Sequence, residues 1–264
     1  MFYFSGFYDR VMRWRVDAAF DPDAVSDEIS KMRQDGGNAN QNLSFIPEGI
    51  KLYSWNSFFG VDFYRTQLHQ GMKLGSGAGL PSPDEELLKD RMDAVMALLR
   101  DEIGWYFFGV DLTGAIPLPQ GVLFIGINDS EQARTLIQDF FEEDGSWRFK
   151  TERYQGREIR YVESIPFLDT LEPAFCVMND YVLAAVNRGL IKEAVDTQED
   201  PERSFLKQGV FKENRYAFDE KSHALFFADI HALMKDVSGI LEWGNQWADV
   251  QLSRQMAFRD GLRT

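Results

Sequence analysis

The clearest pattern in the chain is a short apolar run followed directly by an amphipathic stretch. Val122 to Ile127 is almost continuously apolar and has the length of a strand, which is typical of a strand covered on both faces. The next apolar residues follow the i, i+3, i+4, i+7, i+8 spacing of one helical stripe: Ala133, Leu136, Ile137, Phe140 and Phe141. Either Asn128 with Glu131 or Asp129 with Gln132 has the spacing of a capping box. The segment therefore predicts a strand and a capped helix that packs on a sheet.

The same order of apolar strand, polar step and amphipathic helix occurs three more times, with the polar step at Asn56, Asn187 or Asp229. The copies are unevenly spaced, which argues against a solenoid of fixed period. Hairpins around Gln155–Gly156 and Asn179–Asp180 lie between the copies and argue against a purely parallel sheet. We therefore predict an α+β fold with mixed or antiparallel sheets and helices packed on one face, built from recurrent strand-helix units and hairpins.

Other elements follow from the same periodicities. Strands are predicted over residues 50–55, 102–112 and 222–230, and helices over residues 22–32, 57–68, 82–100, 190–195 and from 233 onward, with a kink at Gly244 and an end at Gly261. Alternation from Phe7 to Phe20 predicts one long half-buried strand, whose partner comes later in the chain or lies outside it. We place the main α+β domain at residues 46–264, after a strand and short helix in residues 1–45.

Composition restricts the partners. The chain has 42 acidic and 28 basic residues and a formal charge of -14, which disfavours nucleic acid and anionic membrane surfaces. It has no recognisable signal peptide and no apolar run near the ~20 residues that a membrane helix needs, so we expect a soluble domain. Cys176 is the single cysteine; its apolar surroundings predict a small buried residue rather than a nucleophile.

Candidate catalytic and binding groups are sparse. The three histidines are His69, His223 and His231; the last two would stand ~25 Å apart along a strand, which disfavours a shared metal. Gly75 to Gly79 resembles a phosphate loop only in composition, because it precedes an acidic helix start and lacks the lysine. Acid pairs occur at helix starts and in loops, where the helix dipole accounts for them. We therefore predict no catalytic, cofactor-binding or metal-binding residues.

The aromatic residues allow a second interpretation. The chain has 22 Phe residues, and Trp55, Trp105, Trp243 and Trp247 could line a pocket for an apolar ligand. Aromatic residues on a regular period more often face a core, and we expect that here.

The order of several short signals resembles a bacterial domain-of-unknown-function family. These signals are Ile46-Pro47 before Leu52-Tyr53, Val122 to Ile127 with Asn128-Asp129 and Ala133, Tyr154-Gln155-Gly156 before Ile159 and Tyr161, Phe175 to Val186 around Asn179-Asp180, and Ser204-Phe205 with Phe211 ahead of Ala224 to Asp229. The resemblance covers roughly residues 46 to 240 and provides no catalytic residues. It implies a longer parent protein with an N-terminal membrane anchor and an extracytoplasmic or periplasmic body. It also implies that the strand at Phe7 to Phe20 is the tail of a preceding repeat.

Three functions remain after these arguments. The first is a non-catalytic interaction or structural module that mediates protein-protein contact in a bacterial cell envelope assembly. The second is a carrier of an apolar or lipid-like ligand held between sheet and helices. The third is a hydrolase that uses His223 or His231.

Overall fold

The protein was analysed as a computed structural model that describes residues 2–8, 11–17, 40–57, 93–114, 116–144, 149–163, 171–209, 212 and 223–261. The chain divides into two compact units, Met1–Asn38 and Ala39–Thr264. The predicted helices over residues 22–32 and 57–68, His69 and the Gly75 to Gly79 loop lie outside the described residues.

The first unit contains an antiparallel pair of strands, β1 (Phe2–Tyr8) and β2 (Val11–Asp17), in which Phe7 lies opposite Met12. The prediction of one long strand from Phe7 to Phe20 is wrong, because the chain reverses between Tyr8 and Val11. The partner of β2 is the segment just before it rather than one later in the chain. The aromatic residues of β1 favour a strand of their own, and two residues between strands are enough for a hairpin.

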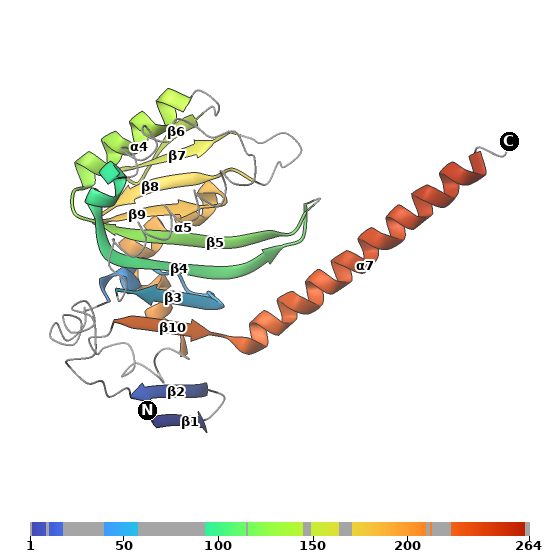
Figure 1. Ribbon diagram of the computed structural model, residues 1–264, viewed down its shortest axis with the longest axis horizontal. Helices are drawn as coiled ribbons and strands as arrows, with labels where there is room; N and C mark the ends of the chain where they lie inside the picture. The colour runs from blue at the N-terminus through green and yellow to red at the C-terminus, as the bar shows by residue number, and fades with distance from the viewer. Residues whose placement is uncertain are drawn as a thin grey trace. The chain divides into compact units, whose positions relative to one another are not determined.

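The second unit is built on an eight-stranded sheet with the order β10-β3-β4-β5-β9-β8-β7-β6, in which every neighbouring pair is antiparallel (Figure 1). Its strands are β3 (Leu52–Asn56), β4 (Leu99–Asp111), β5 (Leu118–Ile127), β6 (Phe149–Tyr154), β7 (Arg157–Val162), β8 (Ala174–Met178), β9 (Tyr181–Ala185) and β10 (Ala224–Ala228). The α+β class is confirmed, and the sheet is antiparallel.

The main core lies between one face of this sheet and the helix α5 (Arg188–Glu199), together with the 3-10 helices η1 (Gln41–Phe45) and η3 (Phe205–Lys207). The short 3-10 helix η2 (Pro201–Arg203) follows α5 and has no buried residue. Phe124 of β5 is fully buried there and contacts the rings of Phe45 and Tyr181 edge-on. Such aromatic contacts add specific geometry to the burial of apolar surface.

The helix α4 (Ser130–Asp144) packs on the opposite face of the sheet, where Ala133 and Ile137 meet Val177 of β8. Figure 1 shows α4 and α5 on the two sides of the sheet. The structure thus differs from the predicted layout in having helices on both faces. Periodicity shows that a helix has an apolar side, but it does not say which face of a sheet that side covers.

Local polar signals start the helices as predicted. Of the two possible capping pairs, Asp129 caps α4: its Oδ1 accepts from the backbone N–H of Glu131 at 2.9 Å. Asn187 Oδ1 accepts from the N–H of Leu190 at 3.1 Å at the start of α5. Each cap satisfies an amide that the helix itself leaves unpaired.

The last helix, α7 (Ile230–Gly261), begins directly after β10 and runs through Gly244 without interruption. Asp229 caps it, with Oδ1 accepting from the N–H of Ala232 at 2.9 Å. Among the described residues, no helix is both long and apolar enough to cross a membrane. The predicted helix over residues 82–100 is described only from residue 93, and β4 begins at Leu99.

Candidate functional site

The most distinctive surface in the described chain is a row of side chains across four strands. The register places Phe226 of β10 opposite Ser54 of β3, Ser54 opposite Trp105 of β4, and Trp105 opposite Leu123 of β5. We call these four residues the open face. They point away from the main core, because side chains alternate along a strand and the neighbours Tyr53, Tyr106 and Phe124 are buried.

The open face is apolar and exposed. Phe226 is 66% exposed, Leu123 40% and Trp105 38%. The prediction that the strand at Val122 to Ile127 is covered on both faces is therefore wrong at Leu123, although Ile127 on the same face is buried. Its apolar residues fill both sides of β5, yet α4 lies over β8 and leaves Leu123 uncovered. Single exposed apolar residues are ordinary, whereas three in one row, here with Ser54 between Phe226 and Trp105, are typical of a binding surface.

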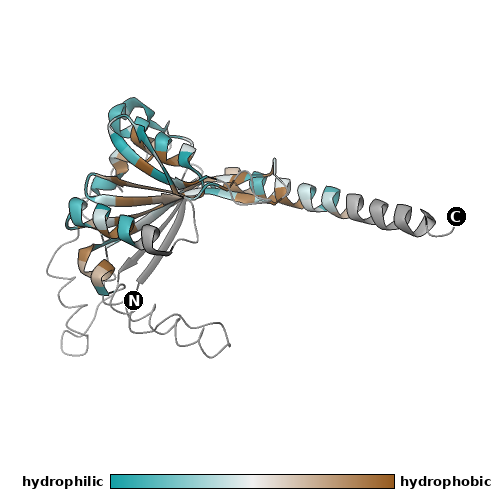
Figure 2. Cartoon of the chain, turned by 90° about the horizontal axis from the view of Figure 1, so that it is seen from above, coloured by the Kyte–Doolittle hydropathy of each residue, from teal (hydrophilic) through white to brown (hydrophobic). Residues whose placement is uncertain are grey.

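The helix α7 carries a second apolar surface, which we call the α7 stripe. Its members are 37–64% exposed: Ile230, Met234, Val237, Ile240, Leu241 and Trp247. Their spacing puts them along one side of the helix. Figure 2 shows hydrophobic and hydrophilic residues alternating along the first half of α7. The stripe is not used to pack α7 on the sheet.

The first turns of α7 are attached to the sheet through polar contacts. Lys51 Nζ, just before β3, lies 2.5 Å from Asp236 Oδ1 of α7. Gly109 of β4 has φ +144 and lets Lys51 and Asp236 approach the backbone closely, since a Cβ there would lie 2.7 Å from Lys51 Nζ. This φ is readily adopted only by glycine. The base of α7 is thereby held beside β3 and β4.

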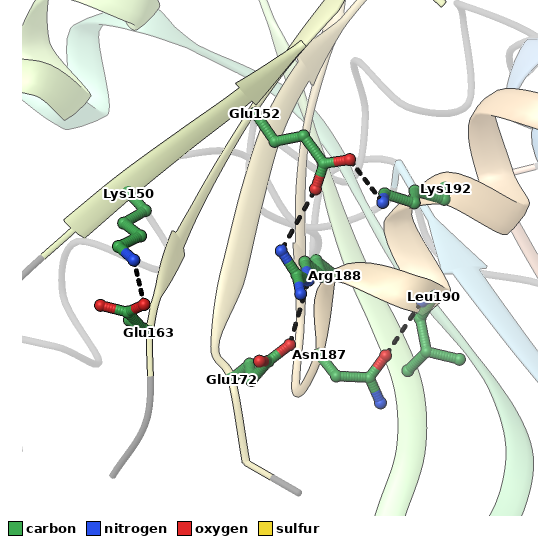
Figure 3. Close-up of polar contacts among 8 residues, drawn as sticks. All are labelled: Lys150, Glu152, Glu163, Glu172, Asn187, Arg188, Leu190 and Lys192. Carbon is green, nitrogen blue, oxygen red and sulfur yellow. Dashed lines mark hydrogen bonds and ion pairs between the residues drawn. The ribbon is translucent and has the colours of Figure 1, made fainter. Parts of the chain in front are cut away.

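The densest group of charges lies elsewhere, where α5 begins against β6 and β7 (Figure 3). Glu152 of β6 pairs with Arg188 at 3.3 Å and with Lys192 at 2.6 Å, and Arg188 also pairs with Glu172 at 3.2 Å. The Arg188 guanidinium lies 4.4 Å from the ring centre of Tyr161. These four charged residues, Glu152, Arg188, Lys192 and Glu172, form the α5 network.

The α5 network is suited to holding α5 in place rather than to catalysis. The hydrogen bond from Lys192, followed by the nearby charges of Lys192 and Arg188, lowers the pKa of Glu152 against the opposing effect of desolvation. A carboxyl group with a lowered pKa is a poor general acid or base near neutral pH. The two cations of the α5 network, Arg188 and Lys192, are already paired with carboxylates of the same chain. The network contains no serine, threonine or cysteine that could act as a nucleophile.

The two described histidines do not converge. His223 and His231 lie at opposite ends of β10, with His223 before the strand and His231 in the first turn of α7. Within the described ranges, no group of three His, Cys, Asp or Glu side chains is arranged to hold a metal ion. The hydrolase hypothesis gains no geometric support from these two residues.

Cys176 lies in β8 and is buried, as the sequence predicts. Burial raises the pKa of its thiol to about 11, so the thiolate needed for nucleophilic attack is scarce at neutral pH. A cavity of about 30 Å³ lies beside it, between α4 and strands β7 and β8. That volume holds about one water molecule and is too small for a lipid-like ligand.

The four tryptophans do not line one pocket. Trp55 is buried in the main core, whereas Trp105 lies on the opposite face of the sheet and Trp247 belongs to the α7 stripe. The expectation of core packing is confirmed for Trp55 and wrong for Trp105 and Trp247, which are exposed. Trp243 lies in α7 and is half-buried. Sequence reasoning missed the open face, although the uninterrupted apolar residues of β5 and β10 exceed what a half-buried strand needs.

A model of the family described as "Protein of unknown function (DUF3352)" matches residues 113–256. The matched region begins in the turn between β4 and β5 and ends within α7, so it includes Leu123, Phe226 and the α7 stripe. No curated protein and no solved structure matches the chain.

Proposed function

The chain belongs to the family described as protein of unknown function (DUF3352), and from that premise we propose that it is a non-catalytic module that binds a protein partner. One observation carries the proposal: Phe226, Trp105 and Leu123 are exposed together in one row of the open face. The α7 stripe adds further uncovered apolar surface in the same unit. Burying such residues against a partner is favourable in proportion to the apolar area removed from water.

The chemistry of the surface favours a protein over a lipid. Aromatic residues are enriched in the cores of protein interfaces and often provide most of the binding energy. The row lies on a sheet and is not an enclosed cavity, which suits a partner that brings its own side chains. The formal charge of -14 also disfavours an anionic membrane.

Site-specific photo-cross-linking in the native host tests this proposal. A photoreactive phenylalanine analogue at Leu123 should give adducts with protein, because this side chain is 40% exposed on the open face. The same analogue at Thr151 is the matched control. Thr151 is also exposed, but it lies in β6, a strand that carries several charged residues. We expect protein adducts when the analogue replaces Leu123 and no adducts when it replaces Thr151.

Two results would count against the proposal. Equal labelling at both positions would indicate non-specific contact. A co-purifying apolar molecule in native mass spectrometry, displaced by Leu123→Lys, would instead support the carrier hypothesis. The envelope location implied by the family resemblance stays a prediction, and an in-frame membrane segment encoded upstream of Met1 would support it.

A further inference from the structure

The strand β10 is an edge of the eight-stranded sheet, and its outer side is unpaired among the described residues. The carbonyl oxygen of His223 accepts from the N–H of Ser57 at 2.7 Å, and the N–H of Asp229 donates to the carbonyl of Lys51 at 2.8 Å. Odd-numbered residues of this segment therefore direct their backbone groups to β3. Because direction alternates along a strand, Ala224, Phe226 and Ala228 direct their N–H and C=O groups outward.

Within β10 itself, the side chains that normally keep sheet edges apart are absent. Edge strands are usually protected by charged side chains, proline or bulges. β6, at the other edge, contains Lys150, Glu152 and Arg153. β10 has the sequence ALFFA, with no charge, proline or glycine. The contrast between the two edges favours a role for β10 in pairing with a strand of another molecule.

We propose that a second copy of this chain pairs with β10 in antiparallel register centred on Phe226, which joins the two sheets into one. This inference rests on the proposed function, since it names one partner of the interaction module. In this register Phe226 faces Phe226 of the second copy, and Ala224 faces Ala228. The outward groups of these residues supply both halves of every new backbone hydrogen bond, so the strand is complementary to itself.

The polar side chains at the two ends of β10 select this register. His223 and Asp229 stand three residues before and three residues after Phe226, so each His223 faces Asp229 of the other copy. Their backbone groups point to β3, which makes them a non-hydrogen-bonded pair with side chains close together. Asp229 uses Oδ1 to cap α7, and its second carboxylate oxygen is available to accept from an imidazole N–H. A shift of two residues would remove both His–Asp pairs.

The two copies of the proposed dimer are related by a two-fold axis, and together they form a larger open face. An axis perpendicular to the sheet keeps both open faces on the same side, and it places the two Phe226 rings next to each other. The largest exposed fraction in the row, 66% at Phe226, is thereby reduced. Each α7 starts at the C-terminal end of its own β10 (Figure 1), so antiparallel pairing puts the two helices at opposite ends of the shared strand pair.

Sedimentation velocity of the whole chain over a concentration series at ~150 mM salt tests the inference. The wild type is expected to form a dimer. Phe226→Lys should be monomeric over the same range, because like charges then face each other across the axis. Thr151→Lys is the matched control: it puts the same residue at an exposed position of β6, the other edge strand and outside the open face, and it should remain dimeric. Circular dichroism confirms that each variant is folded.

Placing a like charge opposite Asp229, and then removing it, tests the register. His223→Glu faces Asp229 of the other copy and should weaken association on the order of tenfold. Adding Asp229→Asn to His223→Glu should restore most of the affinity between the two copies, because the repulsion is removed and asparagine still caps a helix. In addition, Phe226→Cys should give a disulfide-linked dimer on oxidation, whereas Ala224→Cys should not, since Ala224 faces Ala228.

Specific results would overturn the inference. A monomeric wild type at all concentrations would exclude a second copy as the occupant of the β10 edge. A dimer that persists in Phe226→Lys would place the contact on another surface. Neither result affects the cross-linking test at Leu123, because this residue lies on β5 inside the sheet. The proposed function is therefore tested independently of the dimer.

Discussion

At the scale of single residues, Gly104 is the described glycine at which an added Cβ would lie closest to other atoms. It lies opposite Phe124 across β4 and β5, and a Cβ built there would overlap the Phe124 ring and lie 2.7 Å from the carbonyl oxygen of Ser54. Phe124 is fully buried and has no free space to move into, because protein cores are close-packed. The ring of Phe124 therefore occupies the volume that glycine leaves free.

Gly104→Ala should lower the free energy of unfolding by about 1–3 kcal/mol, the usual cost of overpacking a core. Urea unfolding monitored by tryptophan fluorescence measures it. Gly209→Ala is the control: nothing lies within 4 Å of a Cβ at that position, so a change below about 0.5 kcal/mol is expected. Equal effects of the two substitutions would contradict this account of Gly104.

At the scale of elements, the α5 network ties a helix to strands distant from it in sequence. Glu152 of β6 pairs with Arg188 and Lys192 of α5, and Arg188 pairs with Glu172 ahead of β8. The lowered pKa of Glu152 means that the folded state favours its ionised form. The stabilisation is therefore fully present above the carboxyl group's ordinary pKa, and it is lost as the pH falls through the lowered pKa of the folded state.

Glu152→Gln should lower the Tm by roughly 1–3 °C at neutral pH, the size expected for partly exposed ion pairs. The difference from wild type should disappear as the pH falls through the lowered pKa of Glu152 in the folded state, because the unsubstituted carboxyl is then protonated as well. Thermal unfolding at a series of pH values measures both. Glu163→Gln, which removes the more exposed pair with Lys150, should have a smaller effect. A difference that is constant with pH would show that Glu152 acts through packing instead.

At the scale of the whole molecule, the charge of -14 opposes the contact proposed at β10. Two copies repel each other over distances that salt screens, since the Debye length falls from about 30 Å at 0.01 M to about 3 Å at 1 M. The backbone and apolar contacts at the β10 edge are much less sensitive to salt. We therefore expect association of the wild type to strengthen as the ionic strength rises. Sedimentation velocity at low and high salt measures this, and weakening at high salt would indicate that the His223–Asp229 pairs dominate.

The features that the sequence predicts well are those whose cause is local. Gln155 and Gly156 form the predicted turn with φ of 46 and 75, because the shortest hairpins need positive φ at both central residues. The cap at Asn187 is correct for a similar reason: the side chain bonds to an amide three residues away. The strand predicted over residues 50–55 is likewise confirmed as β3, and its Tyr53 and Trp55 face the core.

The features that it misses depend on residues distant in the chain. β10 pairs with β3 across more than half of the sequence, and nothing within either strand specifies the other as its partner. The N-terminal segment was predicted as one strand because alternation continues through Val11–Asp17, while its pairing with Phe2–Tyr8 is a tertiary choice. The helix surfaces were predicted, but not that α4 and α5 take opposite faces.

The turns, the helix starts and the apolar side of each element follow from the amino-acid order alone, because they depend on contacts within a few residues. The exposure of Trp105, Leu123 and Phe226, and the burial of Trp55 and Phe124, follow from how the elements pack. The physical reason is that both groups are equally apolar, and burial depends on whether another element covers that face of the sheet. The candidate binding surface is the part of the apolar pattern that the fold leaves uncovered.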